Sequence, residues 1–209
     1  MKIEQVGQPI MVFDYNNKIK AGTFLAVAGA QFIILTIFAE ALYPNFSVPN
    51  SYISDLGIWN YISAPIFNSS MVLYGLLLLI SSYFIQQEFR LRLLSSMFVL
   101  GGLGAIFAGV FPFDSFVMNG FPVIHNTGAI VAFISGGLAP IISYKVTKKP
   151  FRYFSVILGV IVLIALTLFM VTPSYSYLGL GAGGMESLIF YPGLIWDVAF
   201  GCYLMASSD

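Results

Sequence analysis

Six long stretches of apolar residues without lysine or arginine constrain the fold of this chain more than any other feature of its sequence. They lie at about 21–43, 64–84, 93–111, 122–144, 153–171 and 188–206. Each stretch is long enough to cross a hydrocarbon core of roughly 30 Å as a helix. A transmembrane β-barrel would show alternating apolar and polar residues, whereas residues 76–80 read LLLLI. The sequence therefore predicts an all-α integral membrane protein with a single six-helix transmembrane bundle.

Composition excludes a water-soluble fold. Charged residues make up 9% of the chain and hydrophobic residues 58%, whereas soluble domains carry about 25% charged residues. The formal net charge is zero, which disfavours nucleic acid as a partner. The expected partners are membrane lipids, with a second membrane protein or another copy of this chain as further candidates.

The basic residues predict which side of the membrane each connection faces. They lie on alternate connections between the apolar stretches: Lys2, Lys18, Lys20, Arg90, Arg92, Lys145, Lys148, Lys149 and Arg152. By the positive-inside rule, these connections and both termini are cytoplasmic. We therefore expect a cytoplasmic tail at 1–20, a transmembrane domain at 21–206, and a multi-pass protein of the cell membrane.

The first stretch ends in a sequence like a signal-peptide cleavage site (residues 39–41, AEA), but its length favours a retained helix.

Polar residues gather in the connections that face outward under this orientation. They include most of the acids near the membrane and the chain's one histidine. The set that we treat as a candidate outward-facing polar site comprises Ser54, Asp55, Asp114, His125, Asn126 and Glu186.

Three further polar residues lie within the apolar stretches: Gln31, Asn68 and Asp197. An acid at such a depth costs about 2.5 to 3.5 kcal/mol on insertion scales, so Asp197 is expected to face the bundle interior or water. If the last helix begins by Glu186, then Glu186, Gly193 and Asp197 lie close to one stripe of that helix.

Glycines are frequent in the third and fourth stretches. They are Gly101, Gly102, Gly104, Gly109, Gly128, Gly136 and Gly137. Small residues allow transmembrane helices to approach closely, so we interpret this set as a packing feature, with a kink at Pro140. A groove shaped for a ligand is the alternative.

Three short motifs occur in order along the chain. They are Ser54-Asp55-Leu56-Gly57, then Phe111-Pro112-Phe113-Asp114 followed by His125, then Gly183-Gly184-Met185-Glu186 running into Tyr191-Pro192-Gly193-Leu194-Ile195-Trp196. In content and order they resemble a prokaryotic membrane family catalogued as domain of unknown function 998. The resemblance implies the same membrane architecture and emphasises the same outer residues, but it implies no reaction. Where that family often has arginine after the glutamate, this chain has Ser187, so a local Glu–Arg pair is not implied.

Three functions are compatible with these features. In the first, the protein is a structural, accessory or small-ligand-binding membrane protein, in which His125 and Glu186 exchange hydrogen bonds. In the second, the buried acids line a path for a proton, a cation or a small solute. The absence of an evident internal duplication disfavours this second function.

The third function is an outward-facing, metal-dependent lipid hydrolase with His125 and nearby carboxylates as ligands. A single histidine and the lack of an HExxH motif disfavour a catalytic zinc site. Neither Ser54 nor Ser115 lies in a GxSxG motif, which disfavours serine catalysis. We therefore favour the first function over an enzyme, and we expect no metal and no cofactor.

Overall fold

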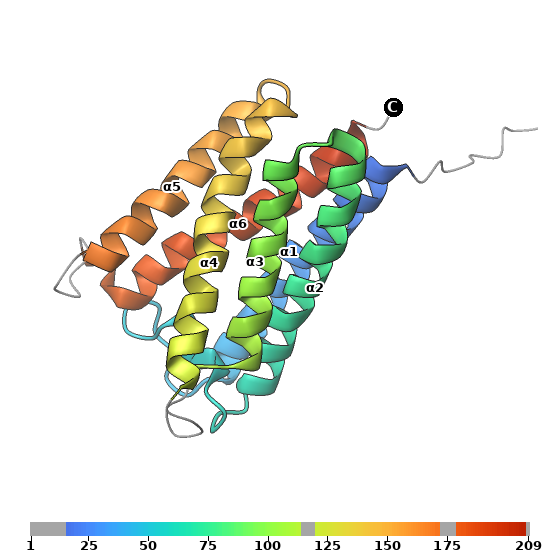
Figure 1. Ribbon diagram of the computed structural model, residues 1–209. Coiled ribbons are helices and arrows are strands. Elements are labelled where there is room, and N and C mark those ends of the chain that lie inside the picture. Colours follow the sequence, from blue (N-terminus) through green and yellow to red (C-terminus); the bar gives the residue numbers. More distant parts are fainter. Residues whose placement is uncertain (1–15, 114–119, 172–178, 208–209) are drawn as a thin grey trace, which may run out of the picture.

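The computed structural model describes residues 16–113, 120–171 and 179–207, and every regular element in these ranges is a helix (Figure 1). The long helices are α1 (Asn17–Leu42), α2 (Ala64–Phe89), α3 (Arg92–Val110), α4 (Phe121–Ile142), α5 (Phe151–Val171) and α6 (Gly181–Ala206). Two short 3-10 helices, η1 (Ile53–Gly57) and η2 (Ser143–Lys145), lie in the connections. The six long helices are long and apolar enough to cross a membrane, which confirms the predicted fold class.

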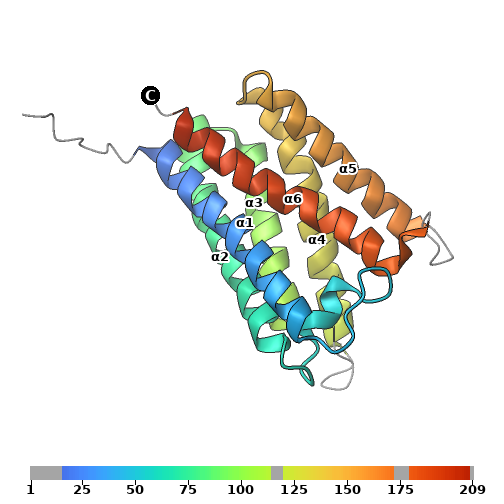
Figure 2. The same cartoon turned by 180° about the vertical axis from the view of Figure 1, so that it is seen from behind.

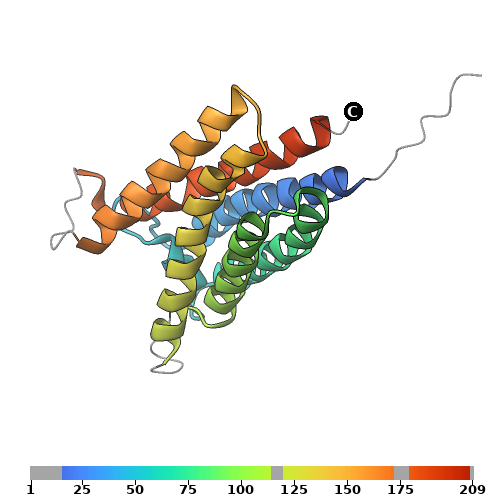
Figure 3. The same cartoon turned by 45° about the horizontal axis from the view of Figure 1, so that its top comes forward.

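The helices form a bundle that closes on itself. Each long helix packs against its neighbours in the chain, and α6 returns to pack against α1 (Figures 1 and 2). The helix α5 packs against both α4 and α6, whereas α4 and α6 contact each other sparsely. Figure 3 shows α4 crossing α6 at a steep angle.

Two helices begin a full turn or more before the apolar stretches that predicted them. The helix α1 begins at Asn17 because the side chain of Asn16 caps it, accepting the backbone N–H of Ile19 at 3.0 Å. The helix α6 begins at Gly181, in a glycine-rich segment that helix propensity alone disfavours. Glu186 consequently lies within α6. Pro122 lies in the first turn of α4, where a residue needs no N–H group for helical hydrogen bonding.

Glycines set close contacts between neighbouring helices. A Cβ atom added to Gly104 would lie 2.5 Å from the carbonyl oxygen of Gly128, and one added to Gly102 would lie 2.7 Å from that of Gly75. These positions admit no side chain without moving a helix, so the packing interpretation holds there. It is wrong for Gly136, where an added Cβ would meet no heavy atom within 4 Å.

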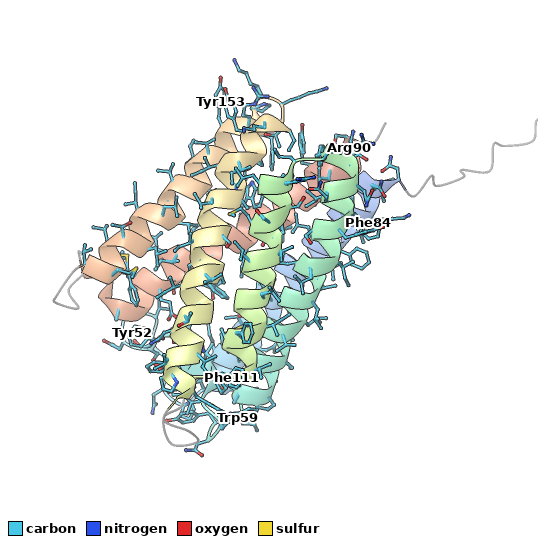
Figure 4. All side chains as sticks on the ribbon, in the orientation of Figure 1. Tyr52, Trp59, Phe84, Arg90, Phe111 and Tyr153 are labelled. Carbon is cyan, nitrogen blue, oxygen red and sulfur yellow. The ribbon has the colours of Figure 1, made fainter. Side chains whose placement is uncertain are left out.

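The two ends of the bundle differ in charge. The described basic residues lie near the start of α1, around the α2–α3 connection and around the α4–α5 connection. We name this the basic end; Arg90 and Tyr153 mark it in Figure 4. The opposite end contains η1 and is named the η1 end; Tyr52 and Trp59 mark it in Figure 4. The start of α1 and the end of α6 both lie at the basic end (Figure 1).

The outer surface of the helices is apolar. Large side chains such as Ile37, Phe38, Ile157 and Ile164 are more than half exposed. Such a surface suits contact with lipid rather than with water.

Candidate functional site

A cavity of about 80 Å³ lies inside the bundle, between η1 and the middle of the helices. All six long helices and η1 contribute residues to its wall. The polar groups on the wall are Ser54, Tyr74, His125 and Glu186. Three of these, all but Tyr74, belong to the candidate polar site that the sequence suggested. The fold thus brings residues of η1, α4 and α6 to one cavity.

The rest of the wall is apolar and rich in aromatic rings. Phe32, Phe67, Phe133 and Phe190 line the cavity together with Tyr74. The ring centroid of Phe32 lies 5.0 Å from that of Tyr74 and 5.0 Å from that of Phe190. The sequence did not predict that these rings belong to the site, because the apolar stretches do not show whether a phenylalanine faces lipid or the bundle interior.

Two glycines of the wall leave space instead of permitting helix contact. Gly136 in α4 and Gly193 in α6 both line the cavity. A Cβ atom added at either position would meet no heavy atom within 4 Å. Each glycine therefore keeps part of the cavity empty.

The buried carboxylate of Glu186 binds the first turn of η1. Its Oε2 atom accepts the backbone N–H of Ile53 at 2.5 Å. The backbone N–H and the hydroxyl of Ser54 also donate to this carboxylate. Backbone N–H groups in the first turn of a helix have no partner within the helix, so Glu186 satisfies donors that would otherwise be buried without one.

Glycines at the start of α6 allow the η1 connection to approach this closely. A Cβ atom added to Gly183 would overlap the carbonyl oxygen of Ser51, and one added to Gly181 would overlap that of Pro49. Gly181 also has a φ of 70°, in the left-handed region that favours glycine. The glycine-rich segment before Glu186 is thus required by the fold.

His125 joins the first turns of α4 to the last turn of α3. Its Nδ1 atom lies 3.0 Å from the carbonyl oxygen of Ala108, to which it donates. That oxygen has no usual helical partner, because the residue four positions later is Pro112, which has no N–H group. The expected hydrogen-bond exchange between His125 and Glu186 is thus replaced by bonds from each residue to backbone groups.

The other members of the predicted polar site lie apart from the cavity wall or outside the described residues. The carboxylate of Asp55 caps its own short helix, accepting the backbone N–H of Tyr52 at 2.9 Å. Burial raises the pKa of Asp55, and the hydrogen bond from Tyr52 opposes that shift. Asn126 is exposed and does not belong to the wall. Asp114 lies outside the described residues.

The polar residues of the spans bond to neighbouring helices and to the η1 connection. Asp197 is buried, and its Oδ2 atom accepts the hydroxyl of Tyr74 at 2.6 Å, which joins α6 to α2. Asn68 donates to the carbonyl oxygen of Gly57 at 2.9 Å. Gln31 donates to a backbone carbonyl of α2 at 3.1 Å. Tyr74 therefore connects the cavity wall to the buried acid.

Among the described residues, no three histidine, cysteine, aspartate or glutamate side chains are grouped so that they could hold a metal ion. Asp55, His125 and Glu186 instead bond to backbone groups. This part of the chain gives no support to a metal-dependent hydrolase.

Six apolar helices around an internal cavity define a polytopic α-helical membrane protein. The family model described as "Protein of unknown function (DUF998)" matches residues 26–203, which is most of the chain. The chain therefore belongs to this family, as its three motifs suggested. No curated protein and no solved structure matches it.

Proposed function

We propose that this chain is a membrane protein that binds a small, largely apolar ligand in the cavity beside η1. The observation that carries the proposal is the composition of the cavity wall, which has a mostly apolar lining and a few polar groups. Small-molecule sites in proteins are generally lined in this way. Gly136 and Gly193 support the proposal, because a mid-helix glycine costs about 1 kcal/mol relative to alanine and no helix contact requires one at either position.

The size of the cavity limits the ligand. Its volume of about 80 Å³ is roughly half that of an engineered cavity of about 150 Å³ that binds benzene. In proportion to benzene, which has six non-hydrogen atoms, this space corresponds to about three such atoms, and we take a compact group of about five as the upper limit. Such a group would be a whole ligand or the head of a longer one.

Binding is tested with tert-butanol as the probe, because its methyl protons give one sharp NMR signal. Saturation transfer from the protein in lipid nanodiscs to tert-butanol should be clear for the wild type and largely lost for Gly136→Leu. Ile134→Phe is the matched control, because Ile134 lies on the same helix and is 40% exposed on its outer surface. Equal transfer in the wild type and in Gly136→Leu would overturn the proposal.

The position of the basic residues supports an orientation in which the basic end is cytoplasmic. The cavity, which extends from η1 to the middle of the helices, would then lie in the outer half of the cell membrane. Lipids would surround the apolar outer face of the bundle.

Cysteine labelling tests this orientation. The exposed Cys202 is first replaced by serine, and Asn50→Cys or Lys149→Cys is then introduced; both positions are exposed, at the η1 end and the basic end respectively. A membrane-impermeant maleimide added to intact cells should label Asn50→Cys. It should label Lys149→Cys only after permeabilisation. The reverse pattern would overturn the orientation.

Transport of a proton, a cation or a small solute is a second candidate, favoured by one observation. Tyr74 lines the cavity and donates to the buried Asp197, which would extend a polar path beyond the wall. Toward the basic end, however, the stacked rings of Phe98, Trp196 and Phe200 fill the core. Proton flux into proteoliposomes that is lost in Asp197→Asn would favour transport, and no flux above that of empty liposomes would favour binding alone.

A further inference from the structure

We propose that the ligand carries a small organic cation of the alkylammonium class, whose positive charge pairs with Glu186. This inference rests on the proposed function, because it names the chemistry of the ligand that the same cavity would hold. Two features of the wall carry it: a carboxylate with no cation beside it among the described residues, and several aromatic rings around the same space.

The first feature is the charge of the wall. Glu186 is buried and lines the cavity, and its described partners, Ile53 and Ser54, are neutral donors. Among the described residues, the one ion pair joins Lys18 to Glu88 at the basic end, away from η1. A buried carboxylate without a countercharge is unfavourable, so a cation entering the cavity would supply the positive charge that the described part of the chain does not.

His125 also lines the cavity and could in principle carry a positive charge. Its ring, however, bonds to backbone carbonyls of the α3 end, at Ala108 and Phe111. The bond to Ala108 turns Nδ1 toward the end of α3, and the hydrogen bonds given for Glu186 come from Ile53 and Ser54 rather than from His125. The described partners of Glu186 therefore carry no positive charge, and the proposal assigns that charge to the ligand.

The second feature is the set of rings. Phe32, Phe67, Tyr74, Phe133 and Phe190 all line the cavity. The faces of aromatic rings attract alkylammonium groups, whose carbon atoms also favour an apolar wall. Aromatic rings with one acid thus match a cation that is apolar over most of its surface.

Other classes of ligand match the wall less well. The wall residues that the structure describes include no lysine or arginine, which disfavours an anion. A polyol or sugar would need more hydrogen-bonding groups than the four polar side chains supply. A metal ion would need several ligating side chains, and none are grouped in this way within the described residues.

The experiment compares two probes of nearly the same shape, the cation tetramethylammonium and neutral tert-butanol. Both are titrated into the protein in nanodiscs, and their dissociation constants are measured by saturation-transfer NMR. We expect the wild type to bind tetramethylammonium at least about tenfold more tightly than tert-butanol. Glu186→Gln should remove this preference and change tert-butanol binding by no more than about twofold.

Glu40→Gln is the matched control. Glu40 is also at the η1 end of the bundle, but it bonds to the hydroxyl of Tyr191 at 2.9 Å and is not part of the cavity wall. Its substitution should leave both dissociation constants unchanged. A loss of cation preference in Glu40→Gln equal to that in Glu186→Gln would overturn the assignment of the charge to Glu186.

Phe133→Leu provides a second variant in case Glu186→Gln does not fold. It removes one ring from the wall and keeps an apolar side chain, so it should weaken tetramethylammonium binding by about threefold or more and leave tert-butanol binding intact. Equal affinity for the two probes in the wild type would overturn the cation inference and leave the proposed function standing. Absence of binding by both probes would overturn the proposed function and this inference together.

Discussion

Glu186 and Ile53 lie 133 residues apart in the chain, yet one hydrogen bond of 2.5 Å joins the carboxylate of the first to the backbone N–H of the second. The bond links the start of α6 to η1 at one end of the cavity. Each residue lies in or beside a motif that the sequence marked as noteworthy. The motifs therefore have a structural role in addition to the proposed binding role.

Glu186→Ala should lower the free energy of unfolding by about 1 to 3 kcal/mol, because it leaves the buried N–H groups of Ile53 and Ser54 without an acceptor. The apparent melting temperature in a mild detergent measures the effect. Glu186→Gln keeps one acceptor oxygen and should lose less than half as much. An alanine variant as stable as the wild type would show that water replaces the carboxylate.

His125→Phe should also be destabilising, by about 1 to 3 kcal/mol, because the carbonyl oxygen of Ala108 then lacks a donor. His125→Asn places an amide donor near the position of Nδ1 and should recover part of the loss. Melting temperatures of the three proteins provide the comparison. If asparagine were as damaging as phenylalanine, the role of His125 would be packing rather than hydrogen bonding.

The glycines should divide into two classes when each is replaced by alanine. Gly136→Ala should be neutral or stabilising by up to about 1 kcal/mol, because its new Cβ atom enters empty space. Gly104→Ala should destabilise by about 1 to 3 kcal/mol, because the new atom would lie 2.5 Å from a backbone oxygen of α4. Similar melting temperatures for the two variants would contradict the described packing.

Asp55 should make stability depend on pH in the acidic range. Because burial raises its pKa in the folded protein, the folded state binds the proton more tightly than the unfolded chain. Its contribution is thus fully present below the ordinary aspartate pKa and is lost as pH rises through the raised value. The difference in melting temperature between the wild type and Asp55→Asn should therefore shift in favour of the wild type on acidification. A constant difference would contradict this account.

The sequence predicted the number and type of the helices because six long apolar stretches leave few alternatives. It also selected Ser54, His125 and Glu186, which the fold brings to one cavity. The sequence also contained a signal for the role of His125. Pro112 lies four residues after Ala108 and has no N–H group, so the carbonyl oxygen of Ala108 lacks its helical donor, and His125 donates to it instead.

Other features depend on which side of each helix faces the interior, and uniformly apolar helices carry little information about this. Tyr74 and the phenylalanines of the wall were therefore missed. Gly136 and Gly104 are chemically identical in the sequence, and only their neighbours in space distinguish a cavity from a helix contact. The helix α6 begins before the last apolar stretch, and the sequence did not reveal this because a glycine-rich segment is a weak helix former in isolation.

If a small molecule occupies the cavity as proposed, its binding depends on the empty space beside Gly193 on the α6 side of the wall. The decisive measurement is the dissociation constant of tert-butanol for the wild type and for Gly193→Leu, in nanodiscs of the same lipid composition. The leucine side chain would fill the space that the probe needs, so binding should weaken by at least about tenfold. An unchanged dissociation constant would show that the probe binds elsewhere and would contradict the claim.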